Sequence, residues 1–163
     1  EDNLELSNGT KIHHSFIIFT GGIEASPITS QLDVDKNGRG QILVNEYLQT
    51  NKYPNIFAIG DIAEIKNKKG EIMPPNVTVA RISGTCAGKN ILAMIKNKKM
   101  TPCDPKLEGI LIALGGKYAA GNLYGLVHVK GRIAYEIKKY VFSSYRKPLL
   151  QLIKAGYKKL KKL

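Results

Sequence analysis

The sequence has no tryptophan, only two cysteines and no long hydrophobic run. Cys86 and Cys103 are far apart and form no C-x-x-C pair, which argues against a disulfide framework or a zinc site and fits a reducing compartment. No apolar stretch approaches the roughly 20 residues of a membrane-spanning helix. No signal peptide opens the chain. Glu1 is not an initiator Met and the first residues look like the middle of a domain, so we expect a fragment of a longer protein.

Acidic residues are also scarce, at 13 Asp and Glu against 25 Lys and Arg, and the formal net charge is +12. The stretch 137–163 carries nine of the basic residues and no acidic one. A hydrophobic content of 43% is typical of a soluble globular chain. A basic end beside a nearly balanced body suggests contact with a membrane surface or an acidic partner.

Two apolar runs stop abruptly at glycine. Ser15–Phe19 precedes Thr20-Gly21-Gly22, and Ile56–Ile59 precedes Gly60-Asp61. Both runs are typical of strands buried on two faces, and their ends can lie side by side at the edge of a parallel sheet, where α/β folds bind ligands. Gly60 would allow close approach of a ligand, and Asp61 can accept hydrogen bonds from sugar-like hydroxyls. A strand ending in Gly-Asp also occurs in ordinary turns, so both interpretations stay open.

The other elements of the first hundred residues follow from local patterns. Asn8-Gly9 predicts a hairpin turn, Gln41–Val44 a short strand and Lys66–Glu71 an exposed hairpin. Asn76 is a plausible N-cap for a helix over Val77–Asn97, where small and apolar residues recur at helical spacing.

The last sixty residues predict an antiparallel sheet followed by helices. Strands are expected at 109–114, 117–120 and 123–129. A helix is expected over Arg132–Tyr145, and Pro148 would start a second, basic amphipathic helix. That last helix could lie on a membrane surface, or it could pack on the domain with solvated lysines.

The order of these motifs is similar to a known family. The stretches Phe16–Gly22, Asn55–Ala63 and Pro74–Leu92, the GILIALGGKYAA hairpin and the basic end resemble the carboxyl-terminal part of type II (single-subunit) NADH:quinone oxidoreductases. These enzymes belong to the FAD-dependent pyridine nucleotide-disulfide oxidoreductase superfamily. The resemblance covers nearly the whole chain.

The resemblance implies an α/β fold, a fragment of a two-dinucleotide-binding-domain flavoprotein. It would comprise a parallel-strand portion of the FAD domain, an antiparallel sheet and C-terminal amphipathic helices. Residues 1–19 would end the pyridine-nucleotide domain, 20–99 would be the C-terminal part of the FAD-binding domain, and 100–163 the sheet and basic membrane-facing helices. The chain has no G-x-G-x-x-G, so both pyrophosphate-binding turns and the NADH site would lie upstream.

The resemblance also implies site residues, although it assigns no catalytic residue and no metal. Asp61 would contact the ribityl hydroxyls of FAD, and backbone N–H groups near the helix start would face the flavin pyrimidine edge. Where the family commonly has Ala-Gln-x-Ala-x-Gln, this chain replaces both glutamines, by Thr78 and Ile82, which favours a non-quinone acceptor. The implied cofactor-binding residues are Gly22, Gly60, Asp61, Val77 and Thr78, and the implied acceptor-pocket residues are Ala80, Arg81 and Ile82.

The implied parent is an FAD-dependent NADH dehydrogenase of a respiratory chain, which passes electrons from NADH through flavin to a quinone-like acceptor; the fragment itself would be inactive. The alternatives are a flavin-dependent reductase with a non-quinone acceptor and a basic membrane-surface binding module. We expect a peripheral location on the cytoplasmic side of the cell membrane. The expected partner is an anionic membrane surface and not nucleic acid. A homodimer is left open as an alternative. The expected membrane-facing residues are Leu149, Leu152, Ile153, Lys154, Tyr157, Lys158 and Leu160.

Overall fold

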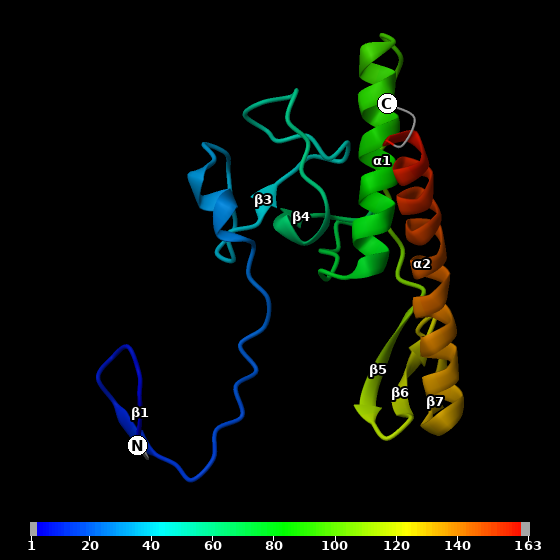
Figure 1. Cartoon of the computed structure of the whole chain (residues 1–163). Helices are drawn as coiled ribbons and strands as arrows, with labels where there is room; N and C mark the ends of the chain where they lie inside the picture. Colours follow the sequence, from blue (N-terminus) through cyan, green and yellow to red (C-terminus); the bar gives the residue numbers. More distant parts are fainter. Residues whose placement is uncertain (1–2, 161–163) are drawn as a thin grey trace. The chain divides into compact units, whose positions relative to one another are not determined.

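A computed structural model describes the backbone of residues 3–160 and their side chains, except those of residue 152 and residues 154–160 (Figure 1). The chain divides into two compact units, residues 1–103 (unit 1) and 104–163 (unit 2). Helices and both parallel and antiparallel strand pairs are present, which confirms the expected mixed α/β class. The boundaries expected from the sequence at residues 19 and 99 stay predictions.

Unit 1 begins with the hairpin that Asn8-Gly9 predicts. Strands β1 (Asn3–Glu5) and β2 (Lys11–His13) pair antiparallel, with Leu4 opposite Ile12. Gly9 has a φ of +82°, and its N–H donates to the Leu6 carbonyl at 2.8 Å. The Asn-Gly turn chemistry therefore predicts this element correctly.

The strand predicted at Ser15–Phe19 is wrong. The segment is irregular and pairs with no described residue, and the Phe16 and Phe19 side chains are 80% and 88% exposed. An extended segment becomes a buried strand only when neighbouring strands take its backbone hydrogen bonds and cover its side chains. The segment instead leads to a short 3₁₀ helix, η1 (Pro27–Gln31).

The run Ile56–Ile59 is also not the doubly buried strand that its sequence predicts. Only Phe57 forms a bridge, to Gln49, while Ile56 and Ile59 are each 39% exposed. The parallel pair of unit 1 joins β3 (Ile42–Leu43) to β4 (Ala63–Glu64), and β4 begins two residues after Asp61. The two glycine-capped runs are therefore not neighbours in a sheet. The predicted short strand at Gln41–Val44 is confirmed by β3.

Three turns of unit 1 share one construction. In each, an asparagine side chain accepts hydrogen bonds from the N–H groups two and four residues later. The residue three positions on has a positive φ, which is +72° at Gly40, +71° at Leu48 and +80° at Gly70. The last of these turns confirms the predicted 66–71 hairpin, closed by a bridge between Lys66 and Ile72. The turns are Asn37–Gln41, Asn45–Gln49 and Asn67–Glu71.

Helix α1 (Val77–Ile95) is the long helix of unit 1. The Asn76 side chain accepts from the Val79 N–H at 2.9 Å, which confirms Asn76 as the N-cap. The helix ends two residues earlier than predicted, and Asn97 has a φ of +51°. The buried residues of α1 recur every three or four positions on one side: Val79, Ser83, Ala87 and Asn90.

A disulfide and a set of hydrogen bonds hold the segment after α1 against the rest of unit 1. Cys86 on α1 and Cys103 are joined by a disulfide with their Cα atoms 5.8 Å apart, so the sequence argument against a disulfide is wrong. The Asn90 side chain donates to the carbonyls of Tyr47 and Thr101 at 3.2 and 3.0 Å, and accepts from the Thr101 N–H at 2.9 Å. The chain turns back beside its own helix, a path that the 17-residue spacing of the cysteines does not reveal.

Unit 2 is a three-stranded antiparallel sheet with one helix. Strands β5 (Gly109–Gly115), β6 (Tyr118–Leu123) and β7 (Val127–Lys130) lie in the order β5-β6-β7. The sheet confirms the predicted hairpin, although its third strand starts four residues later than expected. Helix α2 (Gly131–Leu160) packs on the sheet, and Ala119 of β6 and Ala134 of α2 are fully buried.

Helix α2 is continuous through Pro148, so the predicted break into two helices is wrong. Proline in a helix removes one N–H donor and crowds the carbonyl four residues earlier, at a cost of about 3 kcal/mol, but its fixed φ is one that a helix accepts. The Lys138 ammonium on α2 donates to the Leu111 carbonyl of edge strand β5 at 2.6 Å. Among the described residues, no helix is both long and apolar enough to cross a membrane.

The disulfide gives the first testable prediction. Cys86→Ser should lower the free energy of unfolding of unit 1 by about 3 kcal/mol, because the cross-link restricts the unfolded chain. Urea unfolding of the chain measures this loss. Wild type reduced with dithiothreitol is the matched control and should unfold like the variant. Two reactive thiols in the denatured, unreduced wild type would contradict the disulfide.

Candidate functional site

The Gly60-Asp61 turn lies directly on the first turns of α1. Gly60 begins a 3₁₀ turn, η2 (Gly60–Ile62), with a φ of +66° that favours glycine. Its N–H donates to the Ser83 Oγ at 3.1 Å. A Cβ placed on Gly60 would lie 3.5 Å from the Ala80 Cβ. The turn and the helix are therefore in van der Waals contact.

Asp61 has a fixed backbone and an exposed side chain. Its carbonyl accepts from the Gln41 Nε2 at 3.1 Å, which ties the turn to the residue before β3. The carboxylate is at the surface, where its oxygens can accept hydrogen bonds from a ligand. The backbone of the Gly-Asp turn is thus anchored on two sides, by Gln41 and by Ser83.

The amino end of α1 lies next to this turn. The Asn76 cap accepts the Val79 N–H with its side chain and the Ala80 N–H with its carbonyl. The amides of Val77 and Thr78 precede these bonded groups, at the end of the helix that carries partial positive charge. The site therefore combines a carboxylate acceptor with a helix N-terminus.

The predicted site residues are only partly brought together. Gly60 and Asp61 meet the α1 start, whereas Gly22 is exposed, has a φ of +85° and would have nothing within 4 Å of an added Cβ. Ala80 faces Gly60, while Arg81 is exposed and Ile82 is half-buried. Successive helix residues point about 100° apart, so these three cannot all face one ligand. Their assignment to an acceptor pocket stays a prediction.

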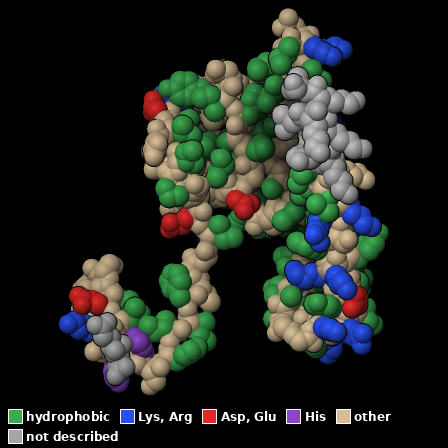
Figure 2. All heavy atoms as spheres, viewed as in Figure 1, with side chains coloured by type: hydrophobic (Ala, Val, Ile, Leu, Met, Phe, Trp, Pro, Cys, Tyr) green, Lys and Arg blue, Asp and Glu red, His purple; other side chains and the backbone are tan. Residues whose placement is uncertain are grey.

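The predicted membrane-facing residues of α2 are described in part. Leu149 and Ile153 are exposed, as are the more N-terminal Tyr140 and Phe142. Figure 2 shows Lys and Arg side chains interspersed with hydrophobic ones over unit 2. The remaining predicted positions, whose side chains lie outside the described residues, are Leu152, Lys154, Tyr157, Lys158 and Leu160.

Sequence reasoning missed two polar residues on the buried side of α1. Neither Ser83 nor Asn90 is among the site residues that the sequence predicts. Both occupy positions where the helical spacing predicts apolar side chains, and both are fully hydrogen-bonded in the structure. A polar residue on an apolar helical stripe is the pattern that could have identified them.

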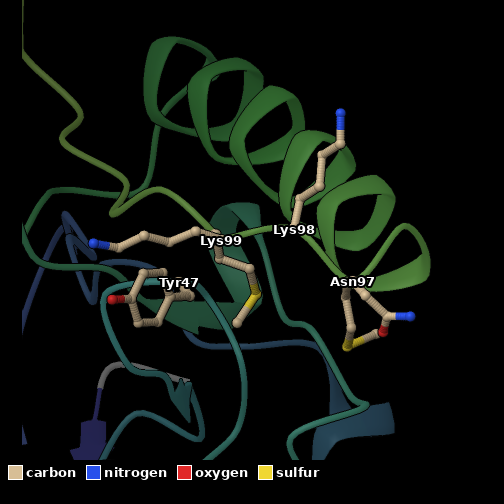
Figure 3. Close-up of a pocket in the computed structure, with 6 residues that line it drawn as sticks. Tyr47, Asn97, Lys98 and Lys99 are labelled. Carbon is tan, nitrogen blue, oxygen red and sulfur yellow. The ribbon is translucent and has the colours of Figure 1, made fainter.

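A cavity of about 420 Å³ lies at the opposite end of α1 (Figure 3). Lys98 points away from Tyr47, whereas Lys99 extends alongside it. Lysines at a helix C-terminus complement the negative end of the helix dipole, so their presence needs no bound anion. The cavity is lined by Tyr47, Met94, Asn97, Lys98, Lys99 and Met100.

A surface cluster around Asp33 lowers the pKa of that carboxyl group. The Lys52 ammonium and the Tyr53 hydroxyl both bond the Asp33 carboxylate and hold its pKa below the usual range. All three groups are at or near the surface, where such pairs contribute little to stability. We therefore assign the cluster to the surface of unit 1 and to no site.

One family model and two curated relatives show what this chain is similar to. A family model for pyridine nucleotide-disulphide oxidoreductases matches residues 1–84. A type II NADH:quinone oxidoreductase of Haemophilus influenzae is 32% identical over 123 residues, which are 75% of this chain and 28% of that protein. A demethylphylloquinone reductase of Synechocystis is 31% identical over 83% of this chain and 33% of its own length. The chain thus spans between a quarter and a third of these relatives.

Solved structures show the same fold. The sulfide:quinone oxidoreductase of Aquifex aeolicus superimposes with a TM-score of 0.57 over 88% of this chain and 37% of that one. The two sequences are 19% identical. At that identity the likeness shows a common fold and nothing about the reaction.

The left-handed backbone of Gly60 gives the second prediction. Gly60→Ala should destabilise unit 1 by about 1 kcal/mol, because an L-residue is strained at positive φ. Gly88→Ala is the matched control, since Gly88 is in the middle of α1 with open space around it and alanine there should stabilise the helix. Urea unfolding distinguishes the two variants. Equal effects at both positions would show that the turn has no such strain.

Proposed function

Because the chain belongs to the pyridine nucleotide-disulphide oxidoreductase family, we propose that it is the carboxyl-terminal portion of an FAD-dependent NADH dehydrogenase. The parent would take hydride from NADH onto flavin and pass the electrons to a quinone-like acceptor. Two of the relatives are named for quinone reduction. The contact between the Gly60-Asp61 turn and the start of α1 is the observation that carries the proposal.

The residues at this turn fit one side of a flavin site. Members of the family bind FAD, which would supply the hydride and electron chemistry when bound. Gly60 packs the turn against Ala80 of α1, and the exposed Asp61 carboxylate would accept hydrogen bonds from ribityl hydroxyls. The first amides of α1, near Val77 and Thr78, would stabilise negative charge on the pyrimidine edge.

The acceptor is the less constrained part of the proposal. The half-buried Thr78 and Ile82 stand where the resembled family has glutamines, and Arg81 adds an exposed cation between them. This difference favours the second candidate, a flavin-dependent reductase with a soluble or protein acceptor. Steady-state assays of the complete protein with a quinone and with ferricyanide separate the two candidates. Turnover with ferricyanide but not with quinone would select the second.

The proposal includes a peripheral location on the cytoplasmic side of the cell membrane, and the surface of helix α2 is what supports contact with a membrane. Its exposed apolar side chains include Tyr140, Phe142, Leu149 and Ile153, and cations follow them closely in sequence. A helix of this composition binds an anionic bilayer surface through apolar burial and electrostatic attraction. The same exposed apolar side chains could instead be covered in a homodimer, which sedimentation equilibrium would detect.

The flavin proposal gives the third prediction. Asp61→Asn in the complete protein should weaken FAD binding about tenfold or more, because a charge-assisted hydrogen bond contributes roughly 1.5–3 kcal/mol. Asp35→Asn, an equal charge change at another exposed carboxylate of unit 1, is the control and should leave the affinity unchanged. Flavin titration followed by fluorescence measures both.

The isolated 163-residue chain should bind FAD weakly or not at all, since it lacks both pyrophosphate-binding turns. Tight, stoichiometric binding of FAD by this chain alone would refute that expectation.

The membrane proposal gives the fourth prediction. Replacing Arg146 and Lys147 by glutamate should reduce sedimentation with anionic vesicles at least tenfold, since each cation near such a surface contributes about 1 kcal/mol. The same double change at Lys98 and Lys99 is the charge-matched control in unit 1. Truncation after Arg146 should abolish binding. Absence of wild-type binding at low salt, or an equal loss in the control, would eliminate the proposal.

A further inference from the structure

Ser83 is the side chain that connects the Gly60-Asp61 turn to α1. It is 0% exposed and sits two turns into the helix, on its buried side. Its Oγ accepts from the Gly60 N–H at 3.1 Å and donates to the Ala80 carbonyl at 3.0 Å. The hydroxyl therefore has its one proton committed inside the helix and a lone pair directed at the turn.

This arrangement fixes the direction of the bond. Because the hydroxyl proton is used by the Ala80 carbonyl, the oxygen can only accept from Gly60, and the turn is held at one position along the helix. Alanine at position 83 would leave the Gly60 N–H facing a methyl group. A half-buried donor without its acceptor would then draw the turn away from the helix toward other partners.

We propose that Ser83 is a positioning residue that sets the separation between the Asp61 carboxylate and the amino end of α1, and through it the affinity and potential of the flavin; this inference rests on the proposed FAD site. Asp61 follows Gly60 directly, and Val77 begins the helix six residues before Ser83. Gln41 holds the Asp61 carbonyl from the other side, and on the helix side the Ser83 hydrogen bond holds the turn, beside the contact of Gly60 with Ala80. A flavin can meet both the carboxylate and the helix amides only if their separation is kept.

A structural role and a positioning role predict different measurements. If Ser83 only supports the fold, its loss lowers the melting temperature and leaves the bound flavin unchanged. If Ser83 positions the turn, its loss also weakens FAD binding and makes the flavin midpoint potential more negative. The potential shifts in that direction because a displaced helix N-terminus stabilises negative charge on the flavin less.

The experiment compares Ser83→Ala with Thr85→Ala in the complete protein. Thr85 is the matched control because its hydroxyl also donates to a helix carbonyl, that of Arg81 at 3.0 Å, but is exposed on the same helix. Titration of the deflavinated protein gives the FAD dissociation constant, and redox titration gives the midpoint potential. Amide hydrogen exchange at Gly60 reports the hydrogen bond itself.

Ser83→Ala should raise the dissociation constant about tenfold, shift the potential negative and speed exchange at Gly60, as expected for one lost hydrogen bond. Thr85→Ala should match wild type in all three. Wild-type affinity and potential in Ser83→Ala would overturn the inference. Should the alanine variant not fold, Ser83→Cys, with its weaker acceptor, takes its place under the same criteria.

The design separates this inference from the proposed function. A wild-type protein that binds no FAD refutes the proposed function and the inference together. Wild-type binding that Ser83→Ala leaves unaffected refutes the inference alone.

Discussion

The hydrogen bonds of the Asn90 side chain are the interaction on which unit 1 most depends. This side chain is 2% exposed, on the apolar side of α1, and its hydrogen bonds all go to backbone groups of Tyr47 and Thr101. A buried amide is tolerated only when its donors and acceptor are satisfied, so these bonds require both chain segments to stay against the helix. The Cys103 N–H, which donates to the Glu46 carbonyl, and the disulfide act on the same segments.

Ser83 and Asn90 each attach a different loop to α1. They lie two turns apart on the same side of the helix, with Ala87 between them. Ser83 holds the Gly-Asp turn near the amino end, and Asn90 holds the turn at Tyr47 and the segment after the helix. Each loop is thus attached to the same helix by a hydrogen-bonded polar side chain.

Features set by adjacent residues could be predicted from the sequence. The Asn8-Gly9 turn, the Asn76 cap and the β5–β6 hairpin each depend on chemistry within a few residues, and each was predicted correctly. The strands at Ser15–Phe19 and Ile56–Ile59 were predicted wrongly. Whether an apolar run becomes a buried strand depends on neighbouring strands, which the run itself does not specify.

In the candidate site, too, local features could be predicted from the sequence and tertiary contacts could not. Gly60 and Asp61 stand out in the sequence, whereas the Ser83 bond joins residues 23 positions apart and follows only from the tertiary structure. The pairing of Cys86 with Cys103 likewise depends on the path of the chain after α1. The continuous helix at Pro148 shows that a residue which often starts a helix can also be accommodated within one.

The bond from Lys138 to the Leu111 carbonyl has a consequence for association between molecules. Strand β5 is at the edge of its sheet and carries exposed Ile110, Ile112 and Leu114, a combination that invites a strand of another chain to add on. The ammonium bonds the Leu111 carbonyl of this edge strand and adds a charge there. Replacing this lysine would therefore remove a charge that disfavours strand pairing between molecules at β5.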